Sequence, residues 1–147
     1  MNRWRMLIAL LVVVLFASPL LADGLKSEDD AKALATKALG HFAKEEFEPG
    51  YKMLIPYWPL PESEIMTLIY QTQSQWEIVR SRFGKSVGTE LVQTERIGTS
   101  FMRLRYIQKF DRHALRWTFA FYRPKGEWVI NEVSFDDDVD TLYRVSE

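Results

Sequence analysis

The stretch "RWTFAFYRPKGEWVINEVSFDDD", residues 116–138, decides the fold that the sequence predicts. Apolar and polar side chains alternate on both sides of Pro124-Lys125-Gly126, a pattern typical of two β-strands joined by a short turn. Because so short a connection cannot cross over a sheet, the two strands must be antiparallel neighbours. The stretch therefore predicts a β-hairpin that is rich in aromatic side chains and ends in three aspartates.

The second strand of this hairpin does not alternate cleanly. Trp128 and Ile130 share one parity, whereas Val133 and Phe135 share the other. An extra residue in one strand shifts the alternation of its side chains by one position. We therefore expect a β-bulge near Asn131-Glu132, which turns all four apolar side chains toward the core.

Two further runs with a period of two residues precede the hairpin, and all connections between the four runs are short. Short connections join neighbouring antiparallel strands, so the sequence predicts a four-stranded meander. The expected strands span residues 87–96, 101–110, 114–123 and 127–135.

Apolar and charged side chains separate onto two faces of this sheet. Trp117 and Phe119 belong to the apolar face, which we expect to point at the helices. The opposite, outer face carries a basic cluster of Arg103, Arg105, Lys109 and Arg116. We expect Lys109 and Arg116 to lie opposite each other on neighbouring strands, and the aspartates within 136–140 to neutralise the cluster. The alternative is that the cluster is presented to a partner.

The helical half of the chain precedes the sheet. Ser27 is a suitable N-cap for a first helix, because Asp30 three residues later completes an arrangement like a capping box. The apolar stripe of this helix runs to Phe42. A second, short helix is expected over 47–54, with an interruption near Pro49-Gly50.

The segment "IPYWPLP", residues 55–61, holds three prolines and cannot be an α-helix. Pro61 fits the first position of a long amphipathic helix that runs over 62–82. Gly84 is the expected stop signal of that helix. Together these patterns predict an α+β fold, in which N-terminal helices pack on a curved four-stranded antiparallel meander sheet.

Three of these features carry a resemblance: "FAKEEFEPGYKML" at residues 42–54, the long helix over 62–82, and "WTFAFYRPKGEWVINEVSFDDD" at residues 117–138. The chain resembles the nuclear transport factor 2-like superfamily, also called cystatin-like in fold, and especially its small secreted members. The resemblance covers most of residues 27–143 and implies a cone-shaped domain. Because this fold hosts isomerases, dehydratases, transport adaptors and immunity proteins alike, it implies no single function.

Residues 1–22 have the layout of a secretory signal peptide. Arg3 and Arg5 precede an unbroken apolar run over 6–16, and the small residue Ala22 ends the segment. That run is short for a bilayer span, which needs about 20 residues. We expect cleavage after Ala22, export to the periplasm or secretion, and no stable membrane insertion after cleavage. The alternative is an uncleaved anchor.

Residues 23–147 have the length of a single domain with a sizeable core. The chain has no Cys, which excludes disulfides, thiol catalysis and thiolate metal sites. Nine basic and three acidic residues lie between Arg80 and Arg116. The formal net charge of the whole chain is nevertheless −1. This balance and the secretory leader argue against a nucleic-acid partner.

Metal and cofactor sites find no support in the sequence. His41 and His113 lack a partner at the spacing of metal ligands. Asp136, Asp137 and Asp138 are consecutive and no glycine follows, whereas calcium loops alternate their carboxylates around a glycine. We therefore predict no metal and no cofactor, and we assign no catalytic residue.

A small enzyme of the isomerase or dehydratase kind is the alternative function. Such enzymes on this fold use a carboxylate inside the cone as base and a tyrosine as oxyanion donor. Tyr70 and Tyr106 are the candidate donors, and Glu132 at the expected bulge is the best-placed acid. No Ser-His-acid or glycine-rich phosphate motif is present.

Aromatic residues make up 14% of the chain, and most of their rings are expected to fill the core. The alternative is that rings at the wide end of the cone bind a small apolar ligand. The pocket candidates are Trp58, Tyr70, Tyr106, Trp117 and Trp128. The favoured function is a non-catalytic exported binding domain for an unknown protein or a small apolar ligand. The sequence leaves open whether the domain forms a homodimer.

Overall fold

The computed structural model describes residues 22–143. The helices are α1 (Glu28–Ala43), α2 (Phe47–Lys52), the 3₁₀ turn η1 (Ile55–Tyr57) and α3 (Glu62–Phe83). The strands are β1 (Ser86–Ile97), β2 (Phe101–Phe110), β3 (Ala114–Tyr122) and β4 (Val129–Asp136), followed by the 3₁₀ turn η2 (Asp140–Tyr143). The leader predicted for residues 1–22 lies outside the described residues, apart from Ala22.

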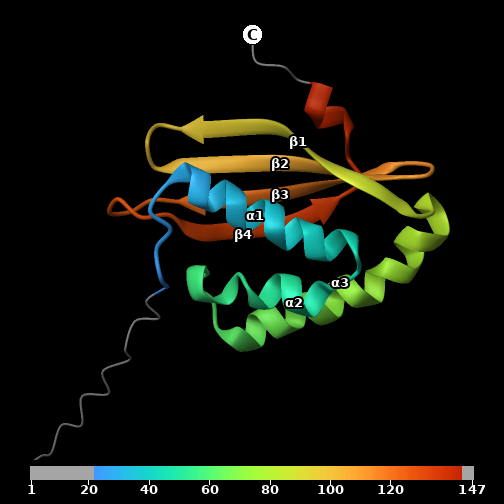
Figure 1. Ribbon diagram of the computed structural model, residues 1–147, viewed down its shortest axis with the longest axis horizontal. Helices are drawn as coiled ribbons and strands as arrows, with labels where there is room; N and C mark the ends of the chain where they lie inside the picture. Colours follow the sequence, from blue (N-terminus) through green and yellow to red (C-terminus); the bar gives the residue numbers. More distant parts are fainter. Residues whose placement is uncertain (1–21, 144–147) are drawn as a thin grey trace, which may run out of the picture.

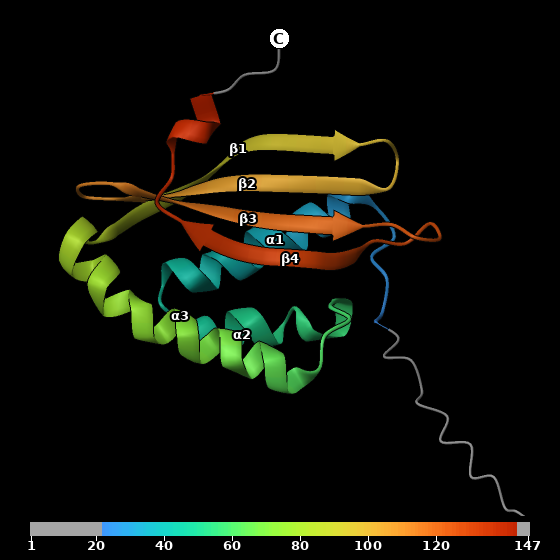
Figure 2. The ribbon, with the colours of Figure 1, turned by 180° about the vertical axis from the view of Figure 1, so that it is seen from behind.

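The four strands form one antiparallel sheet in the order β1-β2-β3-β4, which confirms the predicted meander. The sheet is curved, and α1, α2 and α3 all lie on one of its sides (Figures 1 and 2). The other side faces away from the helices. The architecture is therefore the predicted α+β arrangement of N-terminal helices on a curved antiparallel sheet.

The predicted bulge in β4 is confirmed. Ala120 of β3 pairs with Glu132, whereas the next residue, Phe121, pairs with Ile130, so Asn131 is the extra residue. The bulge brings four apolar side chains to the core: Trp128, Ile130, Val133 and, partly buried, Phe135.

α1 begins where the sequence predicts. The Oγ of Ser27 accepts a hydrogen bond from the backbone N–H of Asp30 at 3.0 Å, which satisfies one of the free donors of the first turn. The inner face of α1 is mostly alanine and ends at Phe42. The Phe42 ring stacks on Trp117 with the ring centroids 4.7 Å apart. Small residues along α1 therefore let the helix approach the sheet closely.

The interruption expected in the second helix is wrong, because α2 runs through Pro49-Gly50. Pro49 is the third residue of α2, and the N–H groups of a first turn have no partner within the helix to lose. Glycine is required at position 50 for a steric reason. A Cβ at this position would lie 2.5 Å from Cε1 of Phe42, so only glycine lets α2 approach α1 this closely.

α3 begins at Glu62, and Pro61 is its N-cap rather than its first residue. Gly84 ends the helix as predicted, with a φ of 88° that lies in the left-handed region. Before α3, residues 55–61 contain no α-helix, as predicted, but Ile55–Tyr57 make the 3₁₀ turn η1.

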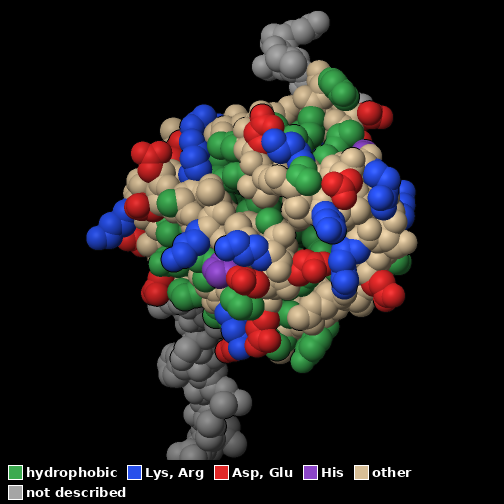
Figure 3. Space-filling view, turned by 45° about the vertical axis from the view of Figure 1, so that its right-hand side comes forward, with side chains coloured by type: hydrophobic (Ala, Val, Ile, Leu, Met, Phe, Trp, Pro, Cys, Tyr) green, Lys and Arg blue, Asp and Glu red, His purple; other side chains and the backbone are tan. Residues whose placement is uncertain are grey.

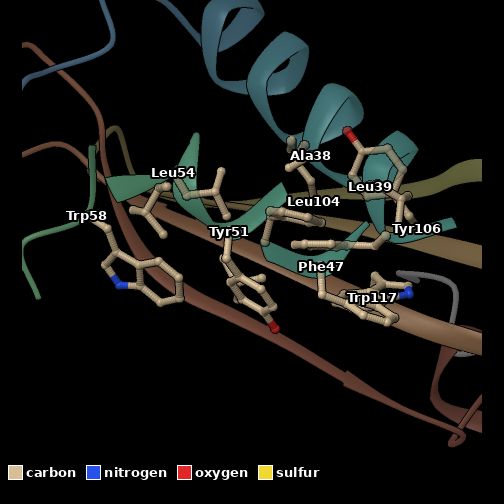
Figure 4. Packing of buried hydrophobic residues seen from close by; sticks show 14 of the residues in the cluster. Ala38, Leu39, Phe47, Tyr51, Leu54, Trp58, Leu104, Tyr106 and Trp117 are labelled. Atoms are coloured by element: carbon tan, nitrogen blue, oxygen red, sulfur yellow. The ribbon is translucent and has the colours of Figure 1, made fainter. Parts of the chain in front are cut away.

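The core lies between the helices and the inner face of the sheet (Figure 4). Trp117 and Phe119 of β3 are fully buried among the core residues, as predicted. Trp76 of α3 packs edge-on against Phe47, with the ring centroids 4.7 Å apart. Large rings from the helices and from the sheet therefore fill the interior.

Polar groups inside this core bond to one another. The Nε1–H of Trp117 donates to Oε1 of Gln108 at 2.9 Å, and Nε2 of Gln108 donates to Oγ of Ser86 at 3.0 Å. The hydroxyl oxygens of Tyr51 and Thr72 lie 3.0 Å apart. Gln108 therefore takes an inward position among the apolar residues of β2 because it satisfies the indole of Trp117.

The residues that follow the predicted cleavage point belong to the fold. The backbones of Leu25 and Trp128 exchange two hydrogen bonds of 2.8 Å, which form an antiparallel bridge next to β4. The N–H of Asp23 donates to the carbonyl oxygen of Pro56 at 2.7 Å. The chain therefore joins the domain from residue 23 onward, without a spacer.

Candidate functional site

Basic side chains on the outer face of the sheet are paired with carboxylates. Glu95 of β1 accepts a hydrogen bond from Arg103 at 2.9 Å, and its other oxygen lies 3.2 Å from Nε of Arg105. Nζ of Lys109 lies 3.8 Å from Glu90, also on β1. Much of the predicted basic cluster is therefore neutralised from β1 rather than from the carboxyl-terminal aspartates.

The register between β2 and β3 corrects a second expectation about this cluster. Lys109 pairs with Ala114 and Arg116 pairs with Ile107, so the expected placement of Lys109 opposite Arg116 is wrong. Arg116 instead donates to Asp136 at 2.6 Å. For Arg116, this bond confirms the predicted neutralisation by the carboxyl-terminal aspartates.

Glu95→Gln is expected to lower the free energy of unfolding by about 0.2–1 kcal/mol at pH 7, since the Glu95 pairs are partly exposed. The hydrogen bond from Arg103 lowers the pKa of the Glu95 carboxyl. A carboxylate with a lowered pKa in the folded state stabilises the fold above its unfolded pKa, and this stabilisation is lost as the pH falls.

Urea titrations of the wild-type and Glu95→Gln proteins at pH 7 and pH 3 measure this effect. The difference between the two proteins should shrink at pH 3 and in high salt. Glu90→Gln is the matched control, because its partner Lys109 is farther away. A Glu95→Gln loss of equal size at both pH values would contradict the pairing.

The aromatic residues predicted to line a pocket do not gather around one. Trp58, Tyr106, Trp117 and Trp128 are at most 5% exposed and belong to the core; Figure 4 shows the first three. Tyr70 is 64% exposed, so the expectation that it points into the cone is wrong. The neighbouring Ile69 faces the core, and one residue further along an α-helix is rotated by about 100°.

The interior offers hydrogen-bonded neutral groups rather than a carboxylate. Within residues 22–143, the buried polar side chains are Thr72 and Gln108, which face the core, and Thr118, which lies on the outer face of β3 with Arg116. Glu132, the acid expected to be best placed for enzyme chemistry, is exposed on the outer face. Burial raises the pKa of the Tyr106 phenol, whose hydroxyl lies 3.0 Å from Oγ1 of Thr36.

The two histidines have separate surroundings. Nδ1 of His41 lies 2.6 Å from a carboxylate oxygen of Glu46, and the His113 ring packs edge-on against Phe83. In the part of the chain that the structure describes, no three His, Cys, Asp or Glu side chains gather in a way that could hold a metal ion.

A groove opens at the end of the domain where α1 and α3 terminate. We call it the end groove, and its volume is about 540 Å³. Its walls are Ala43 at the end of α1, Lys44 and Glu45 between α1 and α2, Trp76 and Arg80 of α3, and the segments 84–86 and 110–112. Three connecting segments that are distant in the sequence therefore meet around one hollow.

Aromatic rings form the floor of the end groove. The ring centroids of Trp76 and Phe110 lie 6.2 Å apart, and both residues line the groove although little of their surface is exposed. Ser86 pairs with Phe110, which brings the start of β1 to the same place. Such a floor suits a ligand with an apolar, ring-containing body.

Part of the charged rim of the groove is engaged in capping α3. The Arg112 guanidinium donates to the carbonyl oxygens of Ser81 and Arg82 at 2.9 and 3.0 Å. The Asp111 carboxylate accepts the backbone N–H of Lys85 at 2.9 Å. These bonds fix the backbone of the groove wall and satisfy the last carbonyls of the helix.

The rest of the rim is an ion pair flanked by lysines. Oε1 of Glu45, on the α1–α2 connection, lies 2.9 Å from Nε of Arg80 on α3. Lys44 and Lys85 are exposed on the same rim. Figure 3 brings this side of the molecule forward and shows basic and acidic side chains interspersed, with apolar atoms between them.

No family model, curated protein or solved structure matches this chain. The resemblance to the nuclear transport factor 2-like superfamily therefore stays a prediction. Among residues 22–143, the structure holds no helix that is long and apolar enough to cross a membrane.

Sequence reasoning missed the end groove because its walls come from connections and not from one motif. The available signal was the meander itself. The end of the long helix, the start of β1 and the end of β2 must meet at one end of an antiparallel sheet. Trp76 of the long helix contributes to the core and also reaches the groove.

Proposed function

We propose that the chain is an exported, non-catalytic binding domain whose end groove takes a small ligand with an apolar ring system. One observation carries the proposal: a hollow of about 540 Å³ is lined by the aromatic residues Trp76 and Phe110 beneath a charged rim. Ligand sites are typically about 300–1,000 Å³, with an apolar lining and a few polar groups at defined positions. The charged rim supplies those polar groups.

Binding is favoured over chemistry by the state of the polar groups. Gln108, Trp117, Tyr106 and Thr72 are each hydrogen-bonded to another protein group. General acid–base catalysis needs a titratable group within reach of the substrate, with a pKa matched to the working pH. The titratable side chains of the groove rim are exposed, and its two carboxylates are engaged: Glu45 by Arg80 and Asp111 by the Lys85 N–H. This state suits recognition of a ligand.

Export is supported by the leader-like sequence of residues 1–22. Sequencing of the amino terminus of the exported protein tests this part of the proposal. The expected terminus is Asp23. An intact Met1 on protein recovered from a membrane fraction would contradict it.

The groove itself is tested with N-phenyl-1-naphthylamine, an uncharged probe of three aromatic rings whose fluorescence rises in apolar surroundings. We expect saturable binding with a Kd of about 1–100 µM. Ala43→Phe, which places a ring in the groove, should weaken binding about tenfold or more, the equivalent of about 1.4 kcal/mol.

Ala33→Phe is the matched control, because Ala33 lies on the same helix but outside the end groove. Its affinity for the probe should stay within about twofold of wild type, a difference too small to indicate a lost contact. Urea titrations confirm that both variants fold. Absence of binding, or binding that only Ala33→Phe weakens, would overturn the proposed site.

A further inference from the structure

The strongest unexplained feature of the molecule is the ion pair that spans the end groove. Glu45 reaches from the α1–α2 connection to Arg80 on α3, with 2.9 Å between the carboxylate oxygen and Nε. We infer that the ligand of the end groove carries an anionic group, and that Glu45 occupies the place of that group on Arg80 in the free protein. This inference rests on the proposed function of the groove.

The backbone of Glu45 shows that this position is unfavourable for a residue with a side chain. Glu45 has a φ of 62°, and within residues 22–143 no other residue apart from glycines has a positive φ. It follows the C-cap of α1, where glycine or asparagine is usual because the left-handed region disfavours a Cβ. What a glutamate adds here is its carboxylate, which reaches the opposite wall of the groove.

The other charged groups of the rim favour a bound anion at Arg80. The Asp111 carboxylate is turned to the N–H of Lys85, and the Arg112 guanidinium is held by backbone carbonyls. Among the described residues, no carboxylate oxygen lies within 4.0 Å of the amines of Lys44 or Lys85. An anion on Arg80 would therefore have two further cationic groups on the same rim.

The C-terminal ends of α1 and α3 do not disfavour a bound anion at Arg80. A helix C-terminus is the negative end of the helix dipole, and both α1 and α3 end at the groove. Backbone carbonyls in the last turn of each helix already accept hydrogen bonds. The Lys44 N–H donates to α1, and the Gly84 N–H and the Arg112 guanidinium donate to α3. The negative helix ends are thus compensated within the protein.

An incoming anion therefore exchanges one carboxylate for another. The ligand takes the guanidinium of Arg80, its rings lie beside Trp76 and Phe110, and Glu45 is released into solvent. Because Arg80 is occupied in the free protein, the apparent affinity is reduced by the fraction of molecules in which the pair is closed. Glu45 is in this sense a built-in competitor of the ligand.

Two probes with the same rings test the inference. 8-Anilinonaphthalene-1-sulfonate carries one sulfonate, and N-phenyl-1-naphthylamine carries no charge. At low and fixed salt, Glu45→Gln should raise the affinity for the sulfonate probe about two- to fivefold, the equivalent of an exposed ion pair. The affinity for the neutral probe should stay unchanged. Arg80→Gln should weaken binding of the sulfonate probe about tenfold or more and spare the neutral probe.

Two variants control for structure. Glu48→Gln removes an exposed carboxylate that pairs with Lys52 on α2, outside the groove, and should change neither probe. Glu45→Gly removes the carboxylate and also relieves the left-handed backbone, so it should match Glu45→Gln in probe binding even if Glu45→Gln is less stable.

The outcomes separate this inference from the proposed function. If both probes bind in the groove but Glu45→Gln and Arg80→Gln change them alike or not at all, the anionic ligand is wrong and the groove stands. If neither probe binds, or if Ala43→Phe leaves both unaffected, the groove is not the site and both proposals fail.

Discussion

Phe119→Ala is expected to lower the free energy of unfolding by about 3–5 kcal/mol. Phe119 is 0% exposed, and its ring packs edge-on against Tyr106 with the ring centroids 5.8 Å apart. The substitution removes the transfer free energy of a whole ring and leaves a cavity between β3 and the helices. The surrounding rings are held on several sides, so the cavity cannot collapse fully.

Urea titration followed by far-UV circular dichroism measures this loss. Phe101→Ala is the matched control, because Phe101 lies on the neighbouring strand β2 but is 38% exposed. Its loss should be about 1 kcal/mol or less, the value of a cross-strand aromatic pair with Tyr122. A Phe119→Ala loss below about 1 kcal/mol would mean that the inner face of β3 does not carry the core.

Gln108→Leu has the second largest expected effect, a loss of about 1–3 kcal/mol of unfolding free energy. Leucine keeps most of the volume but accepts no hydrogen bond, so the Nε1–H of Trp117 loses its partner inside the core. Gln108 is 0% exposed, and solvent cannot replace the lost acceptor without opening the sheet. The cost comes from the unsatisfied donor and not from lost apolar contact.

A double-mutant cycle isolates this bond. When Trp117→Phe removes the donor, the additional loss from Gln108→Leu should fall by about 1 kcal/mol. Gln73→Leu on the solvent-exposed side of α3 is the control and should stay within about 0.5 kcal/mol of wild type. Strict additivity of the two core substitutions would show that the indole has another acceptor.

The sheet could be predicted because its signals are local. A period of two residues marks a strand, and a short connection marks an antiparallel neighbour. The change of parity between Ile130 and Val133 located the bulge near Asn131-Glu132, and the structure shows that Asn131 is the extra residue. What failed was register: Lys109 pairs with Ala114 because the geometry of the turn, which the pattern does not specify, sets the pairing.

The errors in the helical half also arose because the local sequence pattern does not specify how neighbouring elements pack. Pro49-Gly50 was interpreted as an interruption from composition alone, although a proline in the first turn of a helix costs no hydrogen bond. The sequence does not show that the glycine meets Phe42, because that contact depends on how α2 crosses α1. Tyr70 was misplaced by the phase of α3, which is set by Ile65 and Ile69.

The candidate site could not be predicted, because it depends on where the domain leaves space. The pocket candidates were selected because they are aromatic. The structure packs four of them into the core: Trp58, Tyr106, Trp117 and Trp128. The hollow lies instead where three connections meet, and its most informative residue, Glu45, is distinguished by a backbone angle. Neither feature leaves a motif in the sequence.

The bridge between Leu25 and Trp128 sets an order of events for a chain that is cut after Ala22. The bond to be cut adjoins Asp23, whose N–H is held 2.7 Å from the Pro56 carbonyl oxygen. A peptidase needs a free, extended stretch on both sides of its bond, and the docked segment offers none on the domain side. If residues 1–22 are a leader that is cut after Ala22, we predict that its removal competes with folding. A chain whose Leu25–Trp128 bridge forms before the cut would then lose its leader more slowly than an unfolded chain.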